Sequence, residues 1–253
     1  GWISQNSRLK NGKYPSPLVM KQEEEPLDQF SLWIADALIQ SPNLMKIIFE
    51  LMTLGNFHLK VYTIQILEAL VATRPSRTRE AIINSQLVSL LNDFNDAIRD
   101  EAILLLMAIV NGNTHIQSLV AFENIFEKLL SIILEEGGIR GSLVVNDCLS
   151  LISNILKYNT ANQTLFLESG SALQVAKLLQ EILDPNEDFY WNEQRILNLQ
   201  TLFSIMEMLV EPGNKNTAIH QKILFDSGVL MLTLQLAFYN KTPKAVRPFS
   251  LDC

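Results

Sequence analysis

The sequence predicts an all-α fold, an α-solenoid built from stacked helical repeats. One pattern of apolar segments and short breaks recurs every few dozen residues. The apolar side chains inside each copy follow helical spacing, and no run alternates polar and apolar residues over a useful length. Because a single copy cannot bury its own apolar face, neighbouring copies must stack to close a common core.

Four copies of the pattern follow one another along the chain, and a weaker fifth copy at 30–54 precedes them. Each of the four copies opens with a long apolar segment, and these segments lie at 59–72, 97–110, 144–158 and 196–210. A break follows each segment, at Arg74-Pro75, Asn113, Asn159 and Glu211-Pro212-Gly213. A second apolar segment completes the copy, so each copy is expected to be a helical hairpin or a helical triplet.

The segment 102–109 is expected to form an inner helix that is buried on most of its circumference. Its apolar residues fall at positions i, i+3, i+4 and i+7, and few of its positions are polar. The methionines in apolar helical runs are expected to fill the core in the same way. They are Met45, Met52, Met107, Met206, Met208 and Met231.

Two similar turns, Glu168-Ser169-Gly170 and Asp226-Ser227-Gly228, are typical of places where one helix ends and the next begins at once. We expect the glycine of each turn to adopt the left-handed conformation. We expect the Ser or Asp side chain to accept hydrogen bonds from the free amides of the next helix.

The 253 residues are expected to form one solenoid domain at 27–253, incomplete at its C-terminal end, after an irregular polar connector at 1–26. The connector carries three prolines and the acidic run Glu23-Glu24-Glu25. We interpret this run as a solvated face beside a helix start, with a docking motif as the alternative. Neither end of the chain shows the polar pattern of a capping repeat, so a fragment of a longer protein is expected.

The net charge of −7 argues against nucleic acid as a partner, because phosphate binding needs a stripe of Lys and Arg. The longest apolar runs, such as 102–110, are about half as long as the roughly 20 residues that span a bilayer. No segment of the chain is therefore expected to span a membrane. Cys148 and Cys253 are the only cysteines, so no structural disulfide is expected.

No residue set with catalytic or metal-binding spacing is found in the sequence, and no cofactor is predicted. His58, His115 and His220 are scattered, and we assign them to junctions between repeats. Cys148 has no activating base nearby in sequence and is expected to pack as a small buried thiol. Glu135 and Glu136 are adjacent carboxylates in a glycine-bounded loop and are expected to face solvent. These observations favour a binding protein over an enzyme.

Several segments closely resemble the globular head of the general vesicular transport factor family. They are LVAFENIFEK at 119–128, EEGG at 135–138, GSLVVNDCL at 141–149, NILK at 154–157 and NQTLF at 162–166. A looser resemblance extends over most of 30–245. The segments 1–21, 61–70 and 210–214 are most similar to the fungal, Uso-type form of the family.

The resemblance implies an armadillo-like head, followed in the complete protein by a long coiled-coil tail through which the family forms homodimers. It implies a cytosolic tether, peripheral on Golgi and transport-vesicle membranes, which docks vesicles from the endoplasmic reticulum to the Golgi before fusion. It also implies Rab-type small GTPases, SNARE proteins and Golgi membrane receptors as partners, and no catalytic activity or cofactor. This chain contains no sustained heptads, so the tail lies outside it.

Two segments are candidates for partner binding. The loop from Glu135 to Ser142, with Glu135, Glu136 and Arg140, is one, because a family-like motif in a loop is easier to explain by recognition than by packing. The aromatic cluster Phe189-Tyr190-Trp191 is the other.

Two other classes of protein are weighed against the vesicle tether. The alternative is an armadillo-type adaptor of the nuclear-import kind, which would bind basic peptides along a groove lined by recurring Trp and Asn. The acidic charge permits this reading, but Trp does not recur between the copies. A helical-repeat enzyme is the second rival, and the motif search gives it little support.

Overall fold

The computed structural model describes residues 29–82, 87–184, 190–212, 215–239 and 242–246, and over these residues the chain forms helices and no strand. The all-α prediction is therefore confirmed. The helices are α2 (Gln29–Gln40), α3 (Pro42–Leu54), α4 (Phe57–Thr73), α5 (Pro75–Ile82), η3 (Leu87–Asn92), α6 (Asp96–Val110), α7 (Thr114–Phe122), α8 (Ile125–Glu135), η4 (Gly138–Arg140), α9 (Leu143–Leu156), α10 (Thr160–Glu168), α11 (Ser171–Leu183), α12 (Glu193–Val210), α13 (Thr217–Asp226) and α14 (Val229–Phe238). The connector at 1–26 with its acidic run, Phe189 and Cys253 lie outside the described residues.

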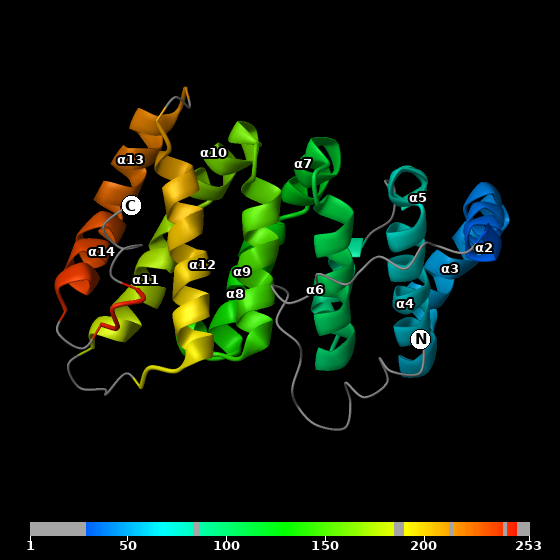
Figure 1. Ribbon diagram of the computed structural model, residues 1–253, viewed down its shortest axis with the longest axis horizontal. Coiled ribbons are helices and arrows are strands. Elements are labelled where there is room, and N and C mark those ends of the chain that lie inside the picture. Colours follow the sequence, from blue (N-terminus) through cyan, green and yellow to red (C-terminus); the bar gives the residue numbers. More distant parts are fainter. Residues whose placement is uncertain (1–28, 83–86, 185–189, 213–214, 240–241, 247–253) are drawn as a thin grey trace.

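The long helices that open the four copies, α4, α6, α9 and α12, lie side by side in chain order (Figure 1). Each is followed by a second helix (α5, α7, α10 or α13) and a third (η3, α8, α11 or α14), so each copy is a triplet. The third helix of the first two copies packs on the first helix of the next copy, η3 on α6 and α8 on α9, whereas α11 packs on α14, the third helix of the next copy. Since α3 packs on α4 in the same way, α2 and α3 take the places of the second and third helices of the weaker fifth copy.

One apolar core runs through the stacked triplets. The segment 102–109 lies in α6, where Ala102, Ile103 and Leu105 have no exposed surface, so its predicted burial is confirmed. Burying a leucine of this kind stabilises the fold by about 1.5–3 kcal/mol. Cys148 on α9 is fully buried as well, as expected.

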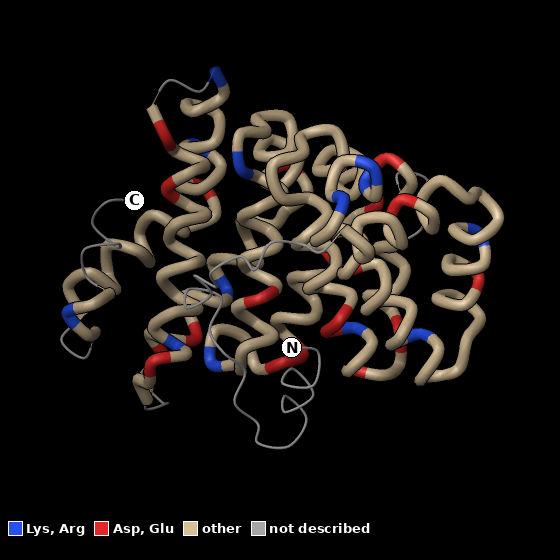
Figure 2. The backbone as a smooth tube through the Cα atoms, turned by 45° about the vertical axis from the view of Figure 1, so that its right-hand side comes forward, with Lys and Arg blue, Asp and Glu red and all other residues tan. Residues whose placement is uncertain are grey.

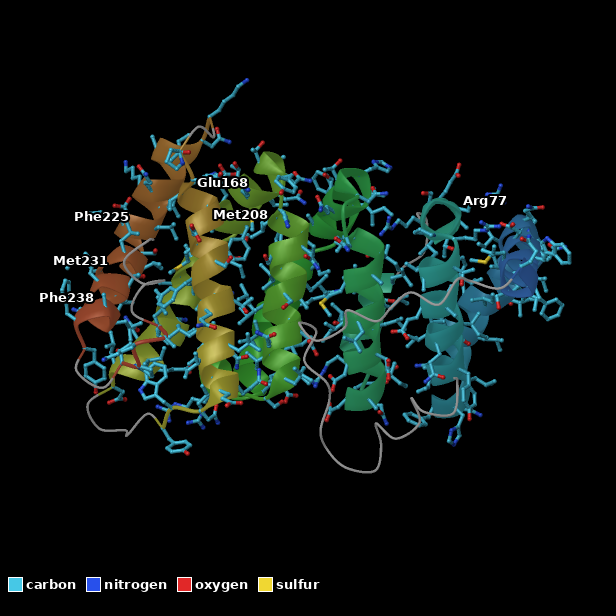
Figure 3. All side chains as sticks on the ribbon, in the orientation of Figure 1. Arg77, Glu168, Met208, Phe225, Met231 and Phe238 are labelled. Carbon is cyan, nitrogen blue, oxygen red and sulfur yellow. The ribbon has the colours of Figure 1, made fainter. Side chains whose placement is uncertain are left out.

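The prediction that the methionines fill the core is wrong for Met231. Met45, Met52 and Met206 are buried, and Met107 and Met208 pack partly buried against the core. Met231 is 52% exposed. It lies with the exposed Phe225 and Phe238 along the outer side of α13 and α14 (Figure 3), a face that no helix covers in the part of the chain that the structure describes.

The two predicted turns, at 168–170 and 226–228, use the left-handed conformation at their glycines, as predicted. Gly170 has a φ of 84° and Gly228 a φ of 81°. The predicted role of the serines is wrong, because each hydroxyl donates to a carbonyl of the helix that ends and neither accepts from an amide of the next helix. Ser169 Oγ donates to Phe166 O at 2.9 Å, and Ser227 Oγ donates to Leu224 O at 3.0 Å. Both serines still have helical backbone angles, so their side chains reach back to the last free carbonyls of the preceding helix.

The turns between first and second helices are fixed by one recurring device that the sequence analysis did not find. The fourth residue of each second helix is polar, and its side chain lies against a carbonyl near the end of the first helix. The contacts are Thr78 Oγ1 to Leu70 O at 2.8 Å, Gln117 Nε2 to Val110 O at 3.4 Å, Gln163 Nε2 to Leu156 O at 3.1 Å and His220 Nδ1 to Leu209 O at 3.0 Å. His220 therefore lies at a junction, as predicted, and its Nε2 also contacts Thr164 Oγ1 of the neighbouring copy at 3.1 Å.

Candidate partner-binding surface

The candidate segment 135–142 forms the tight connection between α8 and α9. Gly137 and Gly138 have φ values of 94° and 63°, which favour glycine. A Cβ atom on Gly138 would lie 2.3 Å from Oε2 at the end of the Glu181 side chain of α11, so that side chain would have to move to make room for it. The paired glycines are therefore explained by their left-handed backbone conformation.

Glu135 and Glu136 differ in environment, although they are adjacent. Glu135 is exposed, as predicted, and accepts a hydrogen bond from Ser131 Oγ at 3.0 Å. The prediction that Glu136 faces solvent is wrong. Its Oε1 accepts a hydrogen bond from Nη2 of Arg99 at 2.6 Å, and the Arg99 side chain is only 9% exposed. Glu136 is thus a partner of a nearly buried cation, and that role keeps it from acting as a free surface ligand.

Arg140 and the backbone around it are held by the next two copies. Nη2 of Arg140 donates to the carbonyl of Glu181 at 3.1 Å. The fully buried Asn198 of α12 donates through Nδ2 to the carbonyls of Ile139 and Gly141, at 3.3 and 3.0 Å. The segment is therefore a clamp between copies, and its position relative to α11 and α12 is fixed.

Arg195 of α12 brings the two candidate segments together. Its Nε donates to the carbonyl of Arg140 at 3.4 Å, and its Nη1 donates to the carbonyl of Tyr190. The Tyr190 ring is 72% exposed, whereas Trp191 is partly buried against the core. We call the resulting surface, formed by Glu135, Arg140, Tyr190, Trp191 and Arg195, the η4 surface.

The residues that join this surface carry little signal in the sequence. Nothing in the sequence marks Arg195, because its contacts are to backbone carbonyls that lie far away along the chain. Asn198 carries a weak signal, since it is the polar position in the apolar run Ile196 to Leu199. A polar residue inside a buried helical run indicates a hydrogen-bonded partner.

Two carboxylates near the N-terminal halves of α6 and α9 have raised pKa values. Burial, with a contribution from the charge of Asp100, raises the pKa of Asp147 to about 6. The pKa of Asp100 is itself raised, first by burial, although its hydrogen bond from Arg99 acts in the opposite direction. Burial also raises the pKa of the Cys148 thiol, so this thiol is protonated at neutral pH and is a poor nucleophile.

The described part of the chain carries charges of both signs. Acidic and basic residues are interspersed over the helices, with no stripe of Lys and Arg (Figure 2). No group of three or more His, Cys, Asp or Glu side chains among the described residues is arranged to hold a metal ion. Within the same residues, no helix combines the length and the apolar character that crossing a bilayer requires.

Comparisons with known proteins identify relatives over almost the whole chain. The "Intracellular protein transport protein USO1" of Saccharomyces cerevisiae is 62% identical over 99% of this chain, which spans 14% of that protein. The human "General vesicular transport factor p115" is 33% identical over 84% of this chain and 23% of its own length. The "Golgin candidate 6" of Arabidopsis thaliana is 31% identical over 89% of this chain and 26% of its own length. The chain thus spans less than a quarter of the first two of these relatives.

Solved structures agree with these relatives. The crystal structure of Uso1-2 matches with a TM-score of 0.87 and 60% identity, covering 99% of this chain and 37% of that one. The crystal structure of Uso1-1 matches with a TM-score of 0.85. No protein-family model matches the chain. The names of the yeast and human relatives denote a transport protein and a transport factor, and none of the three names denotes an enzyme.

Proposed function

Since the chain belongs to the family of general vesicular transport factors that includes Uso1 and p115, we propose that it is a head segment of a vesicle tether. In this role it docks vesicles derived from the endoplasmic reticulum to the Golgi membrane, before SNARE-mediated fusion, as a protein-binding scaffold. The observation that carries the proposal is the 62% identity to the yeast transport protein over 99% of the chain. A rigid stack of triplets suits this role, because its turns and edges can vary without disturbing the core.

The partners proposed for the complete tether are a Rab-type small GTPase, SNARE proteins and Golgi membrane receptors. The complete protein is proposed to form a homodimer through a coiled-coil tail, and to be peripheral on Golgi and transport-vesicle membranes. In this arrangement the head binds the partner proteins, and the tail spans the distance between the two membranes.

The η4 surface is proposed as a contact site for such a partner. It combines an exposed aromatic ring at Tyr190 with the exposed carboxylate of Glu135, next to backbone that is clamped by Asn198 and Arg195. An aromatic side chain on a fixed backbone loses little entropy when it binds, which favours its use in interfaces. Two contacts fix the backbone of this surface: Glu136 pairs with Arg99, and Arg140 donates to the Glu181 carbonyl of α11.

A competition experiment tests both the function and the surface. Excess purified chain is added to a reconstituted assay of vesicle docking to Golgi membranes. The wild-type chain is expected to inhibit docking, because it occupies the sites of the tether. The Glu135→Ala/Tyr190→Ala variant is expected to inhibit at least tenfold less, whereas the matched Glu127→Ala/Tyr62→Ala control, also at exposed positions, keeps full potency.

The two parts of this proposal fail in different ways. Docking that is insensitive to any concentration of the wild-type chain would contradict the proposed function. Equal inhibition by the wild-type chain and the Glu135→Ala/Tyr190→Ala variant would leave the function standing and remove the η4 surface from it.

A further inference from the structure

Tyr158 has a backbone conformation that its residue type disfavours. It lies in the three-residue connection between α9 and α10, after Lys157, with a φ of 58°. The other residues with left-handed φ values in the described part are glycines and Asn124. Tyr158 lies two residues before the first residue of α10. In the preceding copy, the position two residues before the first residue of α7 is Gly112, with a φ of 66°. A tyrosine is strained there, because its Cβ crowds the neighbouring carbonyl oxygen.

Packing does not offset this strain. The Tyr158 side chain is 85% exposed. The Tyr158 ring contacts Lys157, whose Nζ lies 5.4 Å from the ring centroid. Lys157 is also exposed. A cation–π contact at an exposed site is weak. Glycine at position 158 would therefore suit the fold at least as well as tyrosine, as Gly112 does at the equivalent position of the preceding copy.

The backbone on the C-terminal side of Tyr158 is held firmly. Asn159 is buried and donates through Nδ2 to Thr114 O and Ser118 Oγ of α7, at 3.3 and 3.1 Å. Its Oδ1 accepts from the amide of Asn162 at 3.1 Å, and the Asn162 side chain in turn donates to Ile155 O of α9. The Tyr158 ring is thus presented to solvent from a fixed base. Rings presented in this way suit binding, since little freedom is lost when a partner covers them.

The positive charge of Lys157 favours a partner with a negative charge at this turn. Its ammonium group lies beside one face of the Tyr158 ring, which leaves the rest of the ring open to a partner. A partner with a carboxylate next to an apolar side chain can pair with Lys157 and pack on the ring at the same time. At physiological salt, charges beyond about 8 Å are screened, so this local cation outweighs the net acidic charge of the chain.

We propose that Lys157 and Tyr158 form a second partner-contact site, which binds an acidic protein segment carrying an apolar side chain beside a carboxylate. The site follows the C-terminus of α9, whereas the η4 surface precedes its N-terminus, so the two lie about 21 Å apart along a helix of 14 residues (Figure 1). The proposal rests on the proposed function in one respect, because the acidic segment is taken to belong to a protein on the membranes that the tether docks.

Co-sedimentation of the purified chain with Golgi membranes tests the site. The wild-type chain is expected to bind intact membranes and to lose binding to protease-treated membranes. Tyr158→Gly is expected to bind at least tenfold more weakly, with a thermal midpoint that is unchanged or higher because the strain is relieved. Lys157→Glu is expected to weaken binding to a similar extent. Tyr62→Ala is the matched control, since it removes an exposed tyrosine from ordinary helical backbone and is expected to bind like the wild type.

The outcomes separate this site from the proposed function. Absence of binding by the wild-type chain would overturn the proposed function and this site with it. Wild-type binding that Tyr158→Gly retains in full would overturn the site alone. Binding that depends on Tyr158 but survives protease treatment would replace the protein partner with a lipid and overturn the proposed chemistry.

Discussion

Replacing Asp147 with asparagine is expected to stabilise the protein at neutral and alkaline pH and to have little effect in acid. The pKa of Asp147 is raised from 3.8 to about 6, because the carboxylate is largely buried and lies near Asp100. A pKa raised by folding means that the ionised form is disfavoured in the folded state. The resulting penalty is present in full above about pH 6 and disappears as the pH falls through the window from about 6 to 3.8.

The magnitude follows from the size of the shift. Roughly two pKa units at about 1.4 kcal/mol each set an upper limit of about 3 kcal/mol. Because the Asp147 side chain is partly exposed and solvent screens its charge, we expect about 1–2 kcal/mol. For a chain of this size, that corresponds to a rise of about 2–8 °C in the thermal midpoint.

Urea unfolding followed by circular dichroism measures the effect for Asp147→Asn and the wild type at about pH 8 and about pH 4. The substitution is expected to raise the free energy of unfolding at pH 8 and to leave it nearly unchanged at pH 4. Asp226→Asn, at an exposed position on α13, is the control and should change little at either pH. A difference between the Asp147 variant and the wild type that is the same at both pH values would refute the reasoning.

Four further predictions concern the core and the junctions. Leu105→Ala should cost about 2–5 kcal/mol of unfolding free energy, and a urea midpoint equal to that of the wild type would mean that α6 is not an inner helix. Glu136→Ala should cost about 1–3 kcal/mol because Arg99 loses a partner, whereas Glu135→Ala should stay within about 0.5 kcal/mol; similar midpoints for both would contradict the pairing of Glu136 with Arg99. His220→Gln should keep the contact with Leu209 O and His220→Leu should lose about 1–3 kcal/mol, so equal melting of the two variants would argue against the junction device. Cys148 should resist a maleimide in the folded protein and react after unfolding, and rapid labelling of the native thiol, detected by mass spectrometry, would show that α9 opens.

The overall architecture could be predicted from the sequence because it depends on local spacing. The apolar run 102–109 and the breaks at Arg74-Pro75 and Asn159 mark helices and their ends without reference to the rest of the chain. The left-handed glycines at Gly170 and Gly228 are equally local, since the left-handed conformation favours a residue without a Cβ atom. Each of these signals is contained within a few residues.

The candidate surface could be predicted only in part, because its contacts join residues that are far apart in sequence. Glu136 pairs with Arg99, which lies 37 positions earlier, and spacing along the chain gives no sign of that contact. Arg195 likewise reaches Arg140 across 55 positions. Met231 shows the converse, since its helical spacing predicts burial but no described helix covers its face of α14.

Replacement of the matching segment of the Saccharomyces cerevisiae protein by this chain tests the central claim most directly. The two sequences are 62% identical over 99% of this chain, so the chimera keeps the rest of the yeast tether intact. Docking of vesicles from the endoplasmic reticulum to Golgi membranes is then counted for the parent, the chimera and a deletion of the segment. We predict that the chimera docks vesicles like the parent while the deletion does not. A folded chimera that docks no better than the deletion would contradict the claim that this chain is the head segment of a vesicle tether.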